Sequence, residues 1–198
     1  RHPDWVRFVP DICEDLARRD FTVNAMAWSP VRGFADPFGG QADLKSKILR
    51  AVGDPATRFR EDSLRILRGI RFASRFRLEI EAETEKAMAQ LAPLMENLAR
   101  ERVFEELCKL LLCCNAGHLI QYGPVLTRVI PELAPCVGFC QHSKYHIYDV
   151  YGHTAQVGHI FHDGLLSIGR MARQHLEDAV EGDATLVDGL KLDQVLGC

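Results

Sequence analysis

The chain has 198 residues, of which 47% are hydrophobic and 26% are charged, and its formal net charge is −3. These values are ordinary for a folded globular protein, and no stretch approaches the ~20 apolar residues that a membrane-spanning helix needs. Residues 1–10 contain neither an initiator methionine nor the apolar core of a signal peptide. We therefore expect a piece of a longer cytoplasmic chain, large enough for one or two small domains.

The charge is unevenly distributed along the sequence. Residues 1–80 carry 15 Lys and Arg against 11 Asp and Glu, whereas residues 174–198 carry 1 against 6. The basic part is mostly arginine, whose forked guanidinium suits phosphates and base edges, although solvated helix faces have the same composition. The seven cysteines show no disulfide-like spacing, so we expect reduced thiols. No zinc spacing is formed by Cys136, Cys140, His142 and His146.

Residues 11–50 have the pattern of short mixed elements. An apolar stretch at residues 25–28 precedes a turn that ends at Gly33, and a second turn follows at residues 36–40, where Pro and Gly supply the unusual backbone angles. Residues 48–52 have the pattern of a strand that ends at Gly53.

From Asp54 onward the pattern becomes helical, because Asp54 can cap a helix that starts at Pro55. Apolar spacing predicts helices over residues 61–76, 81–92, 99–114, 149–162 and 165–181. Prolines divide the stretch around residues 124–135 into short helical pieces. The expected fold class is therefore a small α+β part followed by a mainly α-helical part.

The arginine-rich segment at residues 58–72 is the most informative part of the sequence. At ~100° per residue, a helix over residues 61–76 places Asp62, Arg65, Arg68 and Arg71 on one face and apolar residues on the other. Such a stripe is often only a solvated face. Three like charges at successive three-residue steps nevertheless repel one another unless an anion lies among them, so anion binding is an equally good interpretation.

Asp62 and Arg65 together form a donor and an acceptor that can pair with a base. Cytosine and adenine each offer a ring nitrogen that accepts and an amino group that donates. Uracil and guanine present N–H donors where the arginine needs acceptors, which costs about 1–3 kcal/mol for each unpaired buried group. The pair therefore selects C and A, while Arg68 and Arg71 can engage phosphates or hold the pair in place.

A second group of polar residues lies at residues 18–27. Asp20 or Thr22 can cap the short helix that follows, and Arg19 is free to meet a phosphate or a ribose. From these residues alone, capping is the better interpretation.

Five motifs in this order resemble those of CCA-adding tRNA nucleotidyltransferases and bacterial poly(A) polymerases. They are RRDFTVNAMA at residues 18–27, DPFGG at 36–40 with Asp43-Leu44, EDSLR at 61–65, ERVFEEL at 101–107, and QHSKYHIYDV at 141–150 with His153-Thr154. Arg68 and Arg71 stand at the matching later positions of the third motif. The resemblance implies a nucleotidyltransferase head over residues 1–56, a helical neck with the nucleotide-reading helix over 57–118, and a helical body over 119–198.

The resemblance also implies an activity, which is Mg²⁺-dependent transfer of CMP and AMP from CTP and ATP to the 3′ end of tRNA. Arg19 would contact the incoming nucleotide, and Asp62 and Arg65 would read its base. Supporting roles fall to Arg68 and Arg71 in binding, to Glu61 in orienting the pair, and to Asp20 and Asn24 beside the ribose.

Two departures from the family pattern limit these expectations. The family's metal-binding carboxylates are expected upstream of Arg1, so we predict no catalytic or metal-ligating residue in this chain and expect it to bind without catalysing. After Thr154 the resemblance fades, and the spacing of His153, His162 and Asp163 is too compressed for an HD-type metal site. Poly(A) synthesis, a non-catalytic nucleotide- or RNA-binding protein, and an HD-type phosphohydrolase are the alternatives.

Overall fold

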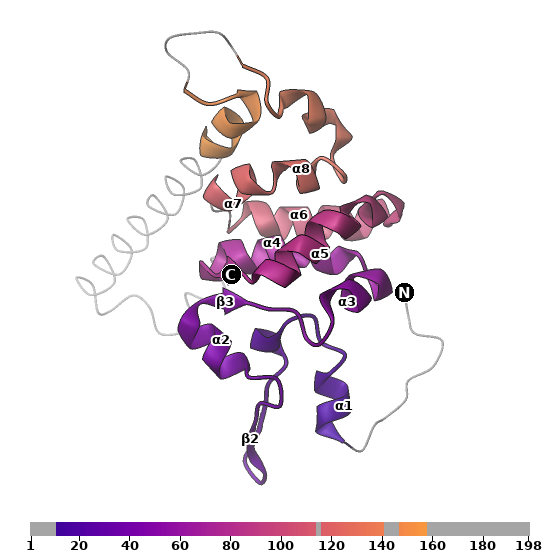
Figure 1. Cartoon of the computed structure of the whole chain (residues 1–198), viewed down its shortest axis with the longest axis vertical. Coiled ribbons are helices and arrows are strands. Elements are labelled where there is room, and N and C mark those ends of the chain that lie inside the picture. The colour runs from indigo at the N-terminus through magenta and orange to yellow at the C-terminus, as the bar shows by residue number, and fades with distance from the viewer. Residues whose placement is uncertain (1–10, 114–115, 141–146, 158–198) are drawn as a thin grey trace, which may run out of the picture. The chain divides into compact units, whose positions relative to one another are not determined.

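The computed structural model describes residues 11–113, 116–140 and 147–157. The chain divides into two compact units, Arg1–His159 and Ile160–Cys198, and every described residue belongs to the first. Short helices and strands make up its N-terminal part, and helices make up the rest, which confirms the expected fold class (Figure 1). None of the helices in this part of the chain is long and apolar enough to cross a bilayer.

The described residues form two small pairs of strands, one within the N-terminal part and one that joins this part to the helical part. Strands β1 (Ala27–Ser29) and β2 (Gly33–Ala35) form an antiparallel hairpin with Trp28 opposite Phe34. Strand β3 (Ile48–Leu49) pairs in parallel with β4 (Glu79–Ile80), which follows the long helix of the next part. Helix α1 (Ile12–Leu16) and the 3-10 helix η1 (Thr22–Asn24) precede the hairpin.

Helix α2 (Gly40–Ser46) starts at the end of the turn that the sequence predicted at residues 36–40. Asp36 accepts hydrogen bonds from the backbone N–H groups of Gly40 at 2.7 Å and Gln41 at 3.0 Å, and so caps the helix. Gly39 has φ 73°, and a Cβ at Gly40 would lie 2.2 Å from the carbonyl oxygen of Thr22. The two glycines therefore allow the turn and a close approach of α2 to η1.

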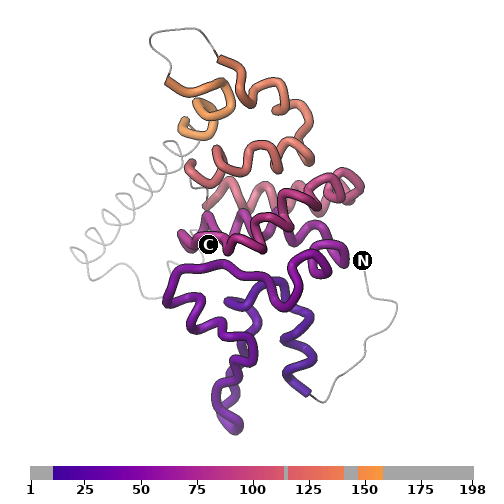
Figure 2. Tube along the Cα trace, viewed as in Figure 1, coloured from indigo at the N-terminus to yellow at the C-terminus, as the bar shows by residue number. Residues whose placement is uncertain are grey.

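The helical part consists of elements packed in succession, as the trace in Figure 2 shows. They are α3 (Pro55–Glu61), α4 (Leu64–Phe76), α5 (Ala82–Leu91), η2 (Ala92–Asn97), α6 (Arg100–Leu111), α7 (Ala116–Gln121), α8 (Gly123–Leu126) and η3 (Pro131–Cys136). Residues 150–157 are also helical. Helix α4 packs against α6, and α3 packs against α5.

The core is built around the apolar side of α4. Ile66, Leu67 and Ile70 are fully buried there, together with Phe21 from the N-terminal part and Met88 from α5. At Gly69 a Cβ would lie 3.1 Å from the ring of Phe21, so the absent side chain lets the aromatic ring approach the helix closely. The core therefore includes residues from both the α+β part and the helical part.

Most predicted elements are confirmed, with shorter bounds. Helices α5 and α6 lie within the predicted ranges 81–92 and 99–114, and the predicted strand at 48–52 is reduced to β3. The helix predicted over residues 61–76 is confirmed from Leu64 to Phe76 as α4, but its start is wrong, because Asp62 is extended (φ −153°, ψ 102°) and separates α3 from α4. The predicted helix at 165–181 lies outside the described residues, and the predicted domain boundaries at 56/57 and 118/119 stay predictions.

Candidate nucleotide-reading site

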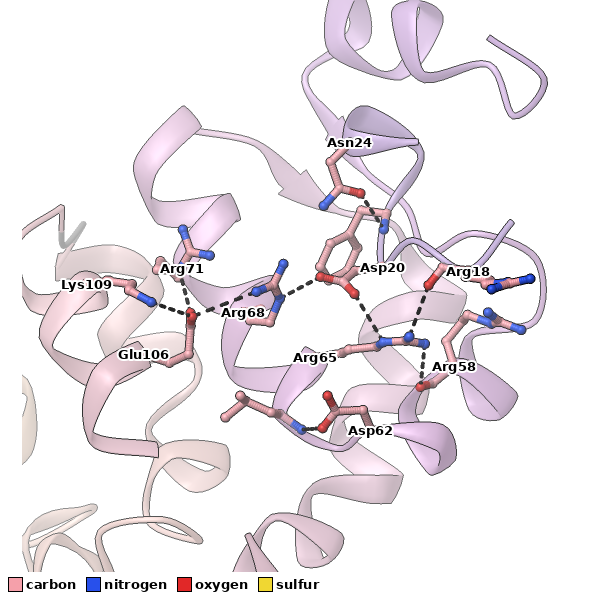
Figure 3. Close-up of polar contacts among 12 residues, drawn as sticks. Arg18, Asp20, Asn24, Arg58, Asp62, Arg65, Arg68, Arg71, Glu106 and Lys109 are labelled. Carbon is pink, nitrogen blue, oxygen red and sulfur yellow. Dashed lines mark hydrogen bonds and ion pairs between the residues drawn. The ribbon is translucent and has the colours of Figure 1, made fainter. Parts of the chain in front are cut away.

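Three arginines of α4 face carboxylates from other parts of the chain (Figure 3). One of these carboxylates belongs to Asp20, whose side chain is 12% exposed and lies between Arg65 and Arg68. Its Oδ1 is 3.1 Å from Nε of Arg65, and its Oδ2 is 2.6 Å from Nε of Arg68. Asp20 therefore fixes two guanidinium groups of α4 at once.

Arg65 is held from several sides. Besides Asp20, its Nη1 donates to Glu61 at 2.9 Å and to the carbonyl oxygen of Arg58 at 3.2 Å, and its Nη2 donates to the carbonyl oxygen of Arg18 at 3.1 Å. Within the described part of the chain, these contacts engage four of the five N–H groups of a guanidinium. The side chain is 14% exposed, so its orientation is strongly determined.

Glu106 of α6 is the second carboxylate among the arginines, and it is 4% exposed. Its Oε2 is 2.7 Å from Nε of Arg71, and its Oε1 is 3.3 Å from Lys109 and 3.9 Å from Nη1 of Arg68. Burial alone raises the pKa of the Glu106 carboxyl. The hydrogen bond and charge of Arg71, followed by those of Lys109, outweigh burial and hold this pKa below its ordinary value of 4.5.

Arg71 is buried, so α4 does not present it on an open face. Arg71 is 8% exposed, pairs with Glu106, and lies with its guanidinium carbon 4.4 Å from the centroid of the Phe72 ring. Helix α6 covers this part of α4 and supplies the carboxylate. The anions that relieve repulsion along the arginine stripe are thus Asp20 and Glu106 of the chain itself.

Asp62 lies in the junction between α3 and α4, so the prediction that it shares a helix face with Arg65 is wrong. Its Oδ1 accepts from the backbone N–H of Leu64 at 3.2 Å, and its Oδ2 accepts from Nη2 of Arg102 at 2.7 Å. Asp and Ser compete with helical backbone bonds and favour caps, which explains the break at Asp62 and Ser63. The acceptor and the donor of the predicted pair are therefore anchored differently, Asp62 by α6 and Arg65 by the N-terminal part.

The remaining predicted residues lie around this group. Arg19 is exposed and contacts Asp15 at 3.4 Å, while Glu61 pairs with Arg58 at 2.9 Å as well as with Arg65. Asn24 accepts from the backbone N–H of Phe21 at 3.1 Å, which is a local cap. The structure thus brings Asp20, Glu61, Arg65 and Arg68 together, whereas Arg19 and Asn24 make local contacts.

Asp43 of the second motif supports the RRDFT segment. It is 8% exposed, and its Oδ2 accepts from the hydroxyl of Thr22 at 2.6 Å and faces Nε of Arg50 at 3.3 Å. Arg50 in turn reaches Glu81 at 3.4 Å. This network joins α2, the N-terminal motif and the start of α5.

Sequence reasoning missed Arg58, Arg102 and Glu106 as members of the site. Arg58 donates to the carbonyl oxygen of Ala17 at 2.9 Å, 41 residues away in the sequence. The signal for the other two was the ERVFEEL motif at residues 101–107, which the resemblance singled out without giving it a role.

The described carboxylates do not fit a metal ion. Within residues 11–113, 116–140 and 147–157, no group of three or more His, Cys, Asp or Glu is placed to hold one. Asp20, Asp62 and Glu106 are instead engaged by arginines. The alternative metal sites depend on His142, His146, His162 and Asp163, which lie outside the described residues. Among the described cysteines, Cys13, Cys108, Cys136 and Cys140 are free.

A groove of about 940 Å³ lies between α6 and the segment from α8 to η3. Its lining is largely apolar and includes Phe104, Leu107 and Pro124, with Arg100 and Arg128 among the charged residues. None of the predicted site residues lines it.

Comparison with known proteins gives two family matches. Residues 1–50 match the poly(A) polymerase head domain, and residues 77–136 match the probable RNA- and SrmB-binding site of polymerase A. The CCA-adding enzyme of Streptococcus mutans is 51% identical over 135 residues, which is 64% of this chain and 34% of that protein. The CCA-adding enzyme of Pediococcus pentosaceus is 43% identical over 144 residues, which is 73% of this chain and 35% of that protein.

Solved structures agree with these matches. The Bacillus stearothermophilus CCA-adding enzyme in complex with CTP has a TM-score of 0.52 and 38% identity, covering 67% of this chain and 31% of that chain. The Thermotoga maritima CCA-adding enzyme complexed with tRNA_CCA has a TM-score of 0.56 and 35% identity, covering 66% of this chain and 32% of that chain.

Fold and matches define a class, which is a nucleotidyltransferase head segment followed by helices that match the probable RNA- and SrmB-binding site of polymerase A. The chain belongs to the family of CCA-adding enzymes and poly(A) polymerases. It spans about a third of the length of the relatives named above.

Proposed function

We propose that this chain carries the nucleotide-reading part of an enzyme that adds CMP and AMP, from CTP and ATP, to the 3′ end of tRNA without a nucleic-acid template. One observation carries the proposal: the Arg65 guanidinium is clamped by Asp20, Glu61 and two backbone carbonyls, three residues after the Asp62 carboxylate. Relatives named as CCA-adding enzymes, one of them with CTP, support it.

The chemistry of this pair favours C and A. With four N–H groups of Arg65 held by described residues, one N–H of the guanidinium is left by that part of the chain to donate to the ring nitrogen of a base. Asp62 accepts from the amino group of the same base, since a carboxylate has about four lone-pair sites and the described residues engage two of them. Uracil and guanine place an N–H against a donor that cannot accept it.

Other residues support the reading pair in this proposal. Glu61 and Asp20 orient Arg65, while Arg68 and Arg71 brace the helix through Asp20 and Glu106. Arg19, an exposed cation that follows Arg18 directly, meets the phosphates of the nucleotide. Asn24 shapes the ribose side by fixing the backbone at Phe21.

Magnesium is implied by the family, but arginines occupy Asp20 and Glu106, and the described residues contain no group of three or more His, Cys, Asp or Glu placed to hold a metal ion. In this proposal the residues of the site perform no catalytic step. Their contribution is to bind the nucleotide, orient it and select its base.

The test is incorporation of labelled nucleotides by the full-length gene product on tRNA that lacks its CCA end. The expected result is addition of C, C and then A, with UTP and GTP refused. Incorporation of A alone would identify a poly(A) polymerase of the same family. Specific CTP and ATP binding without incorporation would identify a nucleotide-binding protein.

A further inference from the structure

Arg102 reaches from the first turn of α6 to the acceptor of the reading pair. Its Nη2 lies 2.7 Å from Oδ2 of Asp62, across 40 positions of sequence. The proposed function assigns Asp62 the amino group of the base and gives Arg102 no part. The contact therefore connects the ERVFEEL motif at residues 101–107, which has no role in the proposed function, to the carboxylate that is proposed to read the base.

Two hydrogen bonds set the direction of the Asp62 carboxylate. The backbone N–H of Leu64 holds Oδ1, which ties the side chain to the start of α4. That bond leaves the second oxygen free to turn, and Arg102 fixes it. An acceptor discriminates between bases only when its lone pairs point in a fixed direction, because a mobile carboxylate can turn away from an N–H that is missing or misplaced.

We propose that Arg102 is a positioning residue of base selection, which holds Oδ2 of Asp62 so that the carboxylate faces the amino group of C or A. This inference rests on the proposed nucleotide-reading function. It adds to that function a residue on a third element, the neck helix α6, which determines specificity without touching the nucleotide.

A purely structural role does not account for this contact. The side chains of Arg102 and Asp62 are 51% and 31% exposed, and exposed ion pairs contribute little to stability. Helices α4 and α6 are already joined by the buried pair of Arg71 and Glu106. Replacing Arg102 therefore leaves the packing of α6 in place.

The test measures equilibrium binding of CTP, ATP, UTP and GTP to the full-length gene product by calorimetry, without tRNA. Arg102→Ala is expected to reduce the preference for CTP over UTP by roughly 10-fold, the effect of one misdirected hydrogen bond. Arg102→Lys is expected to keep most of the preference, since a single nitrogen makes the contact. Arg100→Ala is the matched control, because it removes an exposed cation two residues away on the same helix and should bind like the wild type.

Three outcomes would overturn the inference: an unchanged preference in Arg102→Ala, a Lys variant no better than Ala, or an equal loss in Arg100→Ala. Asp62→Asn separates this failure from that of the proposed function. If Asp62→Asn also keeps the wild-type preference, or if the wild type has none, base reading by Asp62 fails and the inference with it. If Asp62→Asn loses the preference while Arg102→Ala keeps it, only the role of Arg102 fails.

Discussion

In the proposed nucleotide site, the side chain of Asp20 prepares two arginines before the ligand arrives. It holds Arg65 at 3.1 Å and Arg68 at 2.6 Å, so two long side chains lose their freedom when the protein folds and not when the nucleotide binds. Ordering a flexible side chain on binding costs about 0.5–1.5 kcal/mol, and a clamped guanidinium avoids most of that cost. We therefore expect Arg65 to act as a rigid donor.

Arg65→Ala tests this donor directly. The variant should lose the preference for CTP over UTP by about 10- to 100-fold, because the penalty of about 1–3 kcal/mol for the wrong base disappears. Arg75→Ala, which removes an exposed arginine from the last turn of the same helix, should retain it. The measurement is the ratio of binding constants, with thermal unfolding recorded for both variants. An unchanged ratio in Arg65→Ala would mean that the arginine stripe is only structural.

Glu106 is expected to make stability depend on pH. Its folded-state pKa lies below the ordinary value of 4.5, so its contribution is fully present above pH 4.5 and is lost as the pH falls through the folded-state pKa. Glu106→Ala should cost about 3–5 kcal/mol of unfolding free energy at pH 7, since it leaves buried Arg71 without its anion. Glu106→Gln should cost less and should remove this part of the acid dependence. Urea unfolding at pH 7 and pH 4 measures both effects, and a wild-type slope retained in Glu106→Gln would contradict the assignment.

At the scale of elements, the position of α2 depends on the absence of a side chain. A Cβ at Gly40 would lie 2.2 Å from the carbonyl oxygen of Thr22, which is backbone and cannot turn aside. Gly40→Ala should therefore destabilise the protein by about 1–3 kcal/mol, in the range of other overpacked sites. Gly69→Ala is the comparison, because its nearest neighbour is the ring of Phe21 at 3.1 Å and alanine favours a helix interior. Equal thermal stability of Gly40→Ala and the wild type would contradict the close contact.

Periodicity predicted the helices well and the site only in part. Apolar spacing located α5 and α6, and the pair Asp54-Pro55 located the start of α3, where Asp54 caps the helix at 2.9 Å from the backbone nitrogen of Thr57. A helical wheel assumes an unbroken helix, so it placed Asp62 beside Arg65 on one face. The side chain of Asp62 instead binds the backbone N–H of Leu64, which interrupts the helix between α3 and α4. A helical wheel does not take such side-chain-to-backbone hydrogen bonds into account.

The pairing of distant charges was the part that the sequence left open. Arg68 meets Asp20 across 48 positions, and Arg71 meets Glu106 across 35. The stripe of arginines showed that anions were needed, but whether they came from a nucleotide or from the chain depended on how α6 packs on α4. Only the motif resemblance at residues 101–107 indicated that α6, which supplies Glu106, belongs to the site.

Across the whole described unit, charged side chains connect three regions through α4. Arg68 contacts Asp20 of the N-terminal part at 2.6 Å and Glu106 of α6 at 3.9 Å, and Asp20 also holds Arg65. A change at Asp20 or at Glu106 therefore alters the position of Arg68, which both carboxylates contact. Helix α4 is therefore braced from both sides, and this bracing keeps Arg65, the donor of the proposed site, in a fixed direction beside the more exposed junction at Asp62.

A double-mutant cycle tests this connection. Asp20→Asn and Glu106→Gln should be non-additive in unfolding free energy by about 0.5–3 kcal/mol, because Arg68 is shared between the two carboxylates. Asp20→Asn combined with Glu83→Gln is the control, since Glu83 is exposed on α5 and pairs with Lys86; that pair of changes should add within about 0.3–0.5 kcal/mol. Urea unfolding of the four proteins in each cycle gives the coupling. Additivity in the first cycle would mean that the two sides of α4 are braced independently.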